Sequence, residues 1–177
     1  MTVVKILIMG LPAAGKTTFI RRVFEQTDFK QLEDYRPTFG VGVSLYEFKS
    51  SKGVMVSTFD CGGQTSFIES HMKEGWAPIL FGGVSIMLFF VDSAAKENLG
   101  SAVSLLHKYH EHLKANSSRA TVHILASKWD KHTLSLAELD EAFRGMMVYP
   151  VSALDETASY VAQAIIDEFL TDSQRPS

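Results

Sequence analysis

Apolar residues along this chain are grouped in short runs that polar segments separate. Runs of strand length occur at residues 3–9, 41–48, 54–59, 84–91, 121–126 and 147–151. The first, fourth and fifth runs are apolar almost throughout, which is typical of strands that are covered on both faces in a parallel sheet. The pattern therefore predicts six strands, with these three at the centre of the sheet.

The segment KSSKG joins the second and third runs, and it is a short polar turn that ends in glycine. Such a turn predicts a hairpin, and so one antiparallel edge strand. Helical patterns occur at 16–26, 96–115, 135–144 and 156–170. The last of these patterns has residues that recur at three- and four-residue steps, as in a helix: Val161, Ala164, Ile165, Glu168 and Phe169. Strands that alternate with helices predict an α/β fold, with a six-stranded mixed sheet and helices on both of its faces.

Composition narrows the setting of this fold. The 177 residues, 46% of them hydrophobic, fit one domain that covers residues 1–177. A net charge of −3 produces no field that would attract nucleic acid. Cys61 is the single cysteine, which favours a reducing, cytoplasmic compartment. The first apolar run contains Lys5 and the second residue is Thr2, so we expect neither direct membrane insertion nor a myristoyl anchor, and any membrane contact would run through partners.

The stretch GLPAAGKT at residues 10–17 matches the phosphate-loop pattern G-x-x-x-x-G-K-[ST], with an apolar run before it and a helical pattern after it. Backbone N–H groups of such a loop converge on phosphate oxygens at the positive end of the following helix. An ordinary glycine-rich turn is the alternative, and the intact pattern disfavours it. We predict contacts with the nucleotide from Gly10, Ala13, Ala14, Gly15, Lys16, Thr17 and Thr18.

The tetrapeptide SKWD at 127–130 distinguishes between purine bases. Lys128 can pack along a flat base, and the carboxylate of Asp130 can accept hydrogen bonds from N1 and N2 of guanine. Adenine lacks this pair of donors and would leave the carboxylate unpaired. VSAL at 151–154 adds Ser152 and Ala153 beside the base. These stretches favour guanine.

Two further sequence motifs suit binding of a γ-phosphate and its magnesium ion. FDCGGQ at 59–64 places Asp60 where it can hold a magnesium-bound water, Gly63 where its N–H can reach the phosphate, and Gln64 where it can orient the attacking water. RPTFG at 36–40 offers Thr38 as a second magnesium ligand, beside Thr17.

GLPAAGKTT, PTFG, DCGGQ, SKWD and VSAL, in this order, resemble the five nucleotide motifs of the Ras-type small GTPases. DCGGQTSFIES, the long segment between Gln64 and Asp92, and SALDET at 152–157 resemble the Rag/Gtr group. GLPAAGKTT, PTFG and GGQ also resemble the Arf group. We therefore expect a Rag/Gtr-like GTP/GDP switch, with an Arf-like GTPase in trafficking, or a GTP-binding scaffold subunit with little hydrolysis, as alternatives.

The resemblance implies Mg²⁺ as cofactor, GTP and GDP as ligands, Lys16 and Gln64 as catalytic residues, and Thr17, Thr38 and Asp60 around the metal. It also implies an effector protein on the switch face, together with GTPase-activating and exchange proteins. Rag/Gtr proteins normally continue into a roadblock-type domain through which they pair, so a separate roadblock-type protein or a second GTPase is a further expected partner. No arginine stands where an internal finger would be expected, so we predict slow intrinsic hydrolysis.

Overall fold

The computed structural model describes residues 3–32, 41–48, 54–61 and 75–173. For residues 29, 41–43, 47–48, 54 and 59–61 it describes the main chain alone. Three predicted site residues, Thr38, Gly63 and Gln64, lie outside these ranges, and so does the side chain of Asp60.

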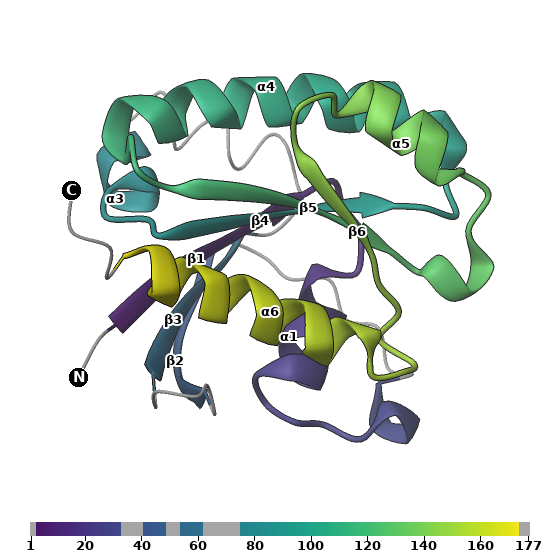
Figure 1. The fold of residues 1–177 in the computed structure, drawn as a ribbon, viewed down its shortest axis with the longest axis horizontal. Helices are drawn as coiled ribbons and strands as arrows, with labels where there is room; N and C mark the ends of the chain where they lie inside the picture. Colours follow the sequence, from purple (N-terminus) through teal and green to yellow (C-terminus); the bar gives the residue numbers. More distant parts are fainter. Residues whose placement is uncertain (1–2, 33–40, 49–53, 62–74, 174–177) are drawn as a thin grey trace.

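A six-stranded sheet forms the centre of the molecule (Figure 1). Its strands lie in the order β2 (Val41–Phe48), β3 (Val54–Cys61), β1 (Val3–Gly10), β4 (Ile86–Asp92), β5 (Thr121–Ser127) and β6 (Met147–Pro150). β2 pairs with β3 in antiparallel register, and the other neighbouring strands of the described sheet are parallel. The predicted mixed sheet with one antiparallel edge strand is confirmed, and β1, β4 and β5 lie inside it as expected.

Helices cover both faces of this sheet (Figure 1). On one face lie α1 (Lys16–Val23) and α6 (Thr157–Asp172), and on the other lie α3 (Ala77–Phe81), α4 (Leu99–Asn116) and α5 (Leu136–Ala142). Three short 3₁₀ turns complete the described elements: η1 (Phe29–Gln31), η2 (Lys96–Asn98) and η3 (Trp129–Lys131).

The core has two halves because strand side chains alternate between the faces of the sheet. In β1, Ile6 and Ile8 pack against the side of α1 and α6, whereas Leu7 and Met9 pack against the side of α3, α4 and α5. All four side chains are almost completely buried. A strand of this kind needs apolar residues at every position, which is why its sequence reads as a continuous apolar run.

Helix boundaries differ from the sequence pattern in several places. α1 ends at Val23 rather than at residue 26, because the N–H of Thr27 turns back to the carbonyl of Arg21 and Gln26 has a positive φ of 55°. The helix predicted at 156–170 is confirmed as α6, in which Ala164 and Glu168 are exposed. The buried stripe of α6 consists of Ala158, Ala162, Ile165, Ile166 and Leu170.

The short helix α3 was not predicted, because five residues are too few to show a helical period. Phe81 at its end is completely buried in the core, beside Tyr109 of α4. Trp76, which precedes α3, keeps 45% of its surface exposed. Phe81 therefore belongs to the core, whereas Trp76 lies at the surface.

Candidate functional site

The site lies at the edge of the sheet where the parallel strands end. Gly10 at the end of β1 is in register with Phe90 of β4, and Asp92 at the end of β4 is in register with Ser127 of β5. Crevices beyond the carboxyl ends of strands are the usual ligand sites of open α/β sheets. The loops that follow β1, β5 and β6 therefore meet here.

The loop after β1 has the backbone of a phosphate cradle. Gly10 approaches β4 so closely that a Cβ there would lie 2.5 Å from the main-chain oxygen of Phe90. Ala13 and Gly15 both have left-handed backbones, with φ of 59° and 85°. A left-handed residue without a glycine's freedom, such as Ala13, is typical of functional loops. The turn leads into the first residues of α1, where the helix dipole favours an anion.

Lys16 is almost completely buried, with 6% of its surface exposed. Its Nζ donates hydrogen bonds to the carbonyl oxygens of Gly10, at 3.2 Å, and Leu11, at 2.9 Å. These bonds hold the ammonium group against the loop that would hold the phosphates. A buried ammonium group held at a phosphate loop is suited to pair with a multiply charged anion.

Ser127 connects this loop to the sheet. Its buried hydroxyl lies 2.7 Å from the carbonyl oxygen of Ala14 and 3.1 Å from that of Val91. The carbonyl of Ser127 accepts hydrogen bonds from the hydroxyl and the N–H of Ser93, which is also buried. The ends of β4 and β5 and the phosphate loop are therefore fixed to one another.

The carboxylate of Asp130 is held from the loop after β6. The hydroxyl of Ser152, 2% exposed, donates to Oδ1 of Asp130 at 2.7 Å. The N–H of Leu154 donates in turn to this hydroxyl at 3.2 Å. Within the described part of the chain, no other group is hydrogen-bonded to the carboxylate of Asp130, so its second oxygen is available to a ligand.

Lys128 lies between the strand ends and the opening of the site. It has a left-handed backbone with φ of 57°, and its Nζ pairs with Oδ2 of Asp92 at 2.5 Å. About a third of its side chain is exposed. The ion pair stretches the aliphatic part of Lys128 along the site, where it offers a flat apolar surface.

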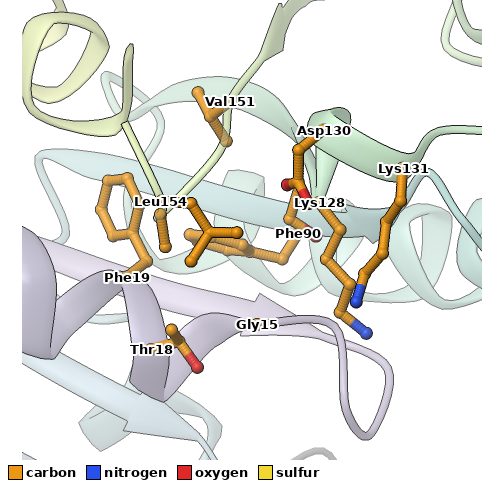
Figure 2. Close-up of a pocket in the computed structure, with 11 residues that line it drawn as sticks. Gly15, Thr18, Phe19, Phe90, Lys128, Asp130, Lys131, Val151 and Leu154 are labelled. Carbon is orange, nitrogen blue, oxygen red and sulfur yellow. The ribbon is translucent and has the colours of Figure 1, made fainter. Parts of the chain in front are cut away.

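A pocket of about 180 Å³ separates the phosphate loop from the base loops. Figure 2 shows Gly15 and Thr18 on one side of it and Lys128, Asp130 and Val151 on the other. Phe19, Phe90 and Leu154 supply apolar walls. The pocket thus combines apolar walls with a few polar groups, as small-molecule sites do.

The structure brings together predicted residues from three distant stretches of sequence. Gly15 and Thr18 of the first stretch, Lys128 and Asp130 of the second and Ala153 of the third line one pocket, and Ser152 supports it. Gly10, Ala13, Ala14, Lys16 and Thr17 lie in the adjoining loop and first turn of α1. Their roles toward a ligand stay predictions, as do those of Thr38, Asp60, Gly63 and Gln64.

Sequence reasoning missed Asp92 as the partner of Lys128 and the apolar walls formed by Phe19, Phe90 and Leu154. Asp92 could have been found, because a carboxylate that ends the apolar run IMLFFV faces the same sheet edge as the phosphate loop. The apolar walls could not have been found, because Phe19 and Phe90 look like ordinary core residues in the sequence.

The chemistry of the described residues fits a magnesium nucleotide. Within the described ranges, no group of three or more His, Cys, Asp or Glu side chains gathers as it would around a fully protein-bound ion. Mg²⁺ typically keeps several waters and takes only one or two protein oxygens together with substrate phosphates. Thr17, directly after Lys16 at the start of α1, carries a hydroxyl oxygen of the kind that such a sparse site would use.

Comparison with known families decides the assignment. The sequence profile of the Gtr1/RagA G protein conserved region matches residues 5–168. The chain belongs to the Gtr1/RagA G protein family. It is a Ras-superfamily small GTPase, and its fold agrees with a P-loop G domain.

Relatives of this Gtr1/RagA family chain include Arf-like proteins. It is similar to GTP-binding protein gtr1 of Schizosaccharomyces pombe, 27% identical over 166 residues, which covers 94% of this chain and 52% of that protein. It is 30% identical over 161 residues to ADP-ribosylation factor-like protein 3 of Saccharomyces cerevisiae, covering 84% and 76%. With ADP-ribosylation factor-like protein 1 of the same yeast it shares 31% over 103 residues, covering 58% and 49%. The match thus spans about half the length of two of these relatives.

None of the helices in the described ranges has the length and apolar character that crossing a membrane requires.

Proposed function

We propose that this protein is a GTP/GDP switch with slow intrinsic GTP hydrolysis, of the Rag/Gtr type. One observation carries the proposal: the residues that suit phosphate and those that suit guanine line the same pocket, with Gly15 on one side and Asp130 on the other. Phosphate affinity alone would fit many nucleotides. A carboxylate with one oxygen held by Ser152 and the other available adds a preference for the N1 and N2 donors of guanine.

In this proposal Lys16 and the loop backbone hold the β- and γ-phosphates, while Lys128 and Ala153 flank the base. Thr17, Thr38 and Asp60 would hold Mg²⁺, which when bound neutralises charge on the phosphate oxygens. Gln64 orients the attacking water. Catalysis of this kind relies on positioning and electrostatic stabilisation more than on proton transfer, and the rate stays slow until an activating protein supplies further charge.

Effector proteins would then bind the face that includes residues 36–40 and 61–75, and exchange and activating proteins would set the nucleotide state. Pairing with a roadblock-type protein or a second GTPase belongs to the same proposal, as does a cytoplasmic setting with membrane contact through partners. The Arf-like relatives support the alternative, an Arf-like GTPase in trafficking.

Binding of guanine can be tested by calorimetry on the full chain with GDP, ADP and xanthosine diphosphate. We expect GDP to bind far more tightly than ADP. In Asp130→Asn, the amide can donate to the 2-oxo group of xanthine but leaves guanine N2 without a good acceptor. We therefore expect at least about a hundredfold loss of GDP affinity and a gain for xanthosine diphosphate. Asp140→Asn, at an exposed position on α5, is the matched control. Equal affinity for GDP and ADP in the wild type would contradict the guanine assignment.

Hydrolysis is tested separately by single turnover of GTP with the wild type and with Gln64→Leu. We expect the variant to bind GTP and to lose most of the slow hydrolysis. Equal rates for the two proteins would favour a scaffold subunit that binds GTP without a catalytic glutamine.

A further inference from the structure

The hydroxyl of Thr157, the first residue of α6, is hydrogen-bonded to the segment before the helix. The hydroxyl of Thr157 accepts the N–H of Ser152 at 2.9 Å and donates to Oδ1 of Asp155. The same carboxylate oxygen accepts the N–H of Thr157 at 2.8 Å. Glu156, the residue before α6, makes no side-chain cap. The polar side chains of this segment therefore fix the turn that leads out of Ser152.

Ser152 is the junction between this turn and Asp130. Its N–H is taken by Thr157, and its hydroxyl donates to Asp130 while accepting from Leu154. At 2% exposure it has no water with which to replace a lost partner. A change at Thr157 is thus transmitted to the main chain of Ser152 and from there to the carboxylate that would read the base.

A second contact ties the same turn to the phosphate side of the pocket. Glu156 pairs with Arg22 of α1 at 2.8 Å, and α1 is the helix that begins directly after the phosphate loop. Because the carboxylate of Glu156 is 63% exposed, solvent screens this pair. Thr157 is also exposed, but its bond from the N–H of Ser152 is partly buried because Ser152 itself is buried, so this bond is better shielded than the pair of Glu156 and Arg22.

We infer that Thr157 is a positioning residue for guanine recognition: through Ser152 it sets the orientation of the Asp130 carboxylate toward N1 and N2 of the base. This inference rests on the proposed function and deepens it. It also assigns a role to part of the SALDET stretch: Asp155 and Thr157 fix the position of Ser152, which in turn is hydrogen-bonded to Asp130.

The test compares GDP with inosine diphosphate, which keeps the N1 donor of guanine but lacks the N2 amine. Affinities of both are measured by calorimetry on the full chain, with Thr157→Val as the main variant. We expect the wild type to prefer GDP, and the variant to lose about three- to tenfold in GDP affinity while inosine diphosphate loses less, so that the ratio narrows. Thr157→Ser keeps the hydroxyl and should restore the ratio. Thr171→Val removes a hydroxyl bonded to the carbonyl of Asp167 near the other end of α6 and is the matched control.

Several outcomes overturn the inference. If Thr157→Val weakens both nucleotides equally, or lowers only thermal stability, Thr157 merely supports the start of α6. A double-mutant cycle with Ser152→Ala adds a check, because residues that act through one another give non-additive effects and additive losses would contradict the pathway. If Thr157→Val does not fold, Asp155→Ala removes the acceptor of the Thr157 hydroxyl, and an unchanged ratio there counts against the inference.

The two levels of the proposal can be told apart. Wild-type protein that binds neither diphosphate overturns the proposed function together with this inference. Wild-type protein that prefers GDP, with the full preference retained in Thr157→Val, overturns this inference alone.

Discussion

The two ends of the parallel strands treat buried polar groups differently. At the carboxyl ends, Lys16, Ser127 and Ser152 are buried and each is hydrogen-bonded. Toward the amino end of β5, His123 is also buried, and its Nδ1 has no hydrogen-bond partner in the described part of the chain. An unsatisfied buried polar atom costs stability. The difference therefore indicates that the carboxyl ends provide hydrogen-bond partners for these buried polar groups, whereas the amino end of β5 contains a buried nitrogen without one.

The surroundings of His123 complete the comparison. Its Nε2 lies 3.1 Å from Oγ1 of Thr121, and its ring lies 5.8 Å from that of Tyr149 on β6. Burial lowers the pKa of His123, and the carboxylate of Glu168 on α6 acts in the opposite direction without reversing the shift. The amino end of β5, with its poorly solvated imidazole, therefore contrasts with the carboxyl ends, where Lys16, Ser127 and Ser152 each have a hydrogen-bond partner.

The largest effect is expected from the most buried charge of the carboxyl end. Lys16→Met removes the ammonium that would contact two phosphates, so we expect GDP affinity to fall at least about a hundredfold. Lys30→Met, at an exposed position, should leave the affinity unchanged. Calorimetry measures both. Retained affinity in Lys16→Met would show that the buried lysine of this end has a structural role only.

A smaller effect on binding and a clear effect on stability are expected from the serine that joins the loop to the sheet. Ser127→Ala leaves the carbonyl of Ala14 without its side-chain donor, so we expect a loss of about 1–3 kcal/mol in the free energy of unfolding. The loosened phosphate loop should also bind GDP several times more weakly. Urea unfolding and calorimetry test the two effects.

Ser104→Ala provides the control for that experiment, because Ser104 is exposed on α4 and its hydroxyl donates to the carbonyl of Gly100 in the same helix. If both serine variants lose the same free energy of unfolding, the buried bond from Ser127 to Ala14 contributes no more to stability than an exposed bond within a helix.

Much of the site at the carboxyl ends of the strands could be predicted from the sequence, because contiguous motifs supply its residues. The strand before Gly10, the loop to Thr17 and the pair Lys128 and Asp130 are local patterns, and the alternation of apolar runs and helices predicted the sheet around them. The tether from Ser127 to Ala14 could not be predicted, since the two residues are 113 positions apart and any serine can make such a bond.

Helix ends and short helices were the least predictable elements for a related reason. α1 stops early and α3 forms within five residues because local turns and core contacts decide them, not a repeating pattern. The role of Thr157 was hidden as well, because a threonine at the start of a helix normally suggests a cap. Thr38, Gly63 and Gln64 stay predictions from the motif alone.

The smallest expected effect comes from the opposite end and depends on pH. Burial holds the pKa of His123 in the folded protein below its ordinary value of about 6.5 in the unfolded chain. Above that value both states are neutral, and as the pH falls below it the unfolded state takes up the proton more readily, so folding loses stability. His123→Phe keeps the ring volume and removes the titration. We therefore expect its free energy of unfolding to fall less than that of the wild type between pH 7.5 and pH 5.

Urea unfolding across this pH range measures the difference, and His107→Gln shows what the loss of an exposed imidazole does by itself. Nucleotide binding at pH 7.5 should be the same in His123→Phe as in the wild type, because the imidazole lies away from the carboxyl ends of the strands. Parallel pH curves for His123→Phe and the wild type would mean that folding leaves the pKa of the buried imidazole unchanged. The interpretation of the amino end of β5 as holding a poorly solvated imidazole would then be wrong.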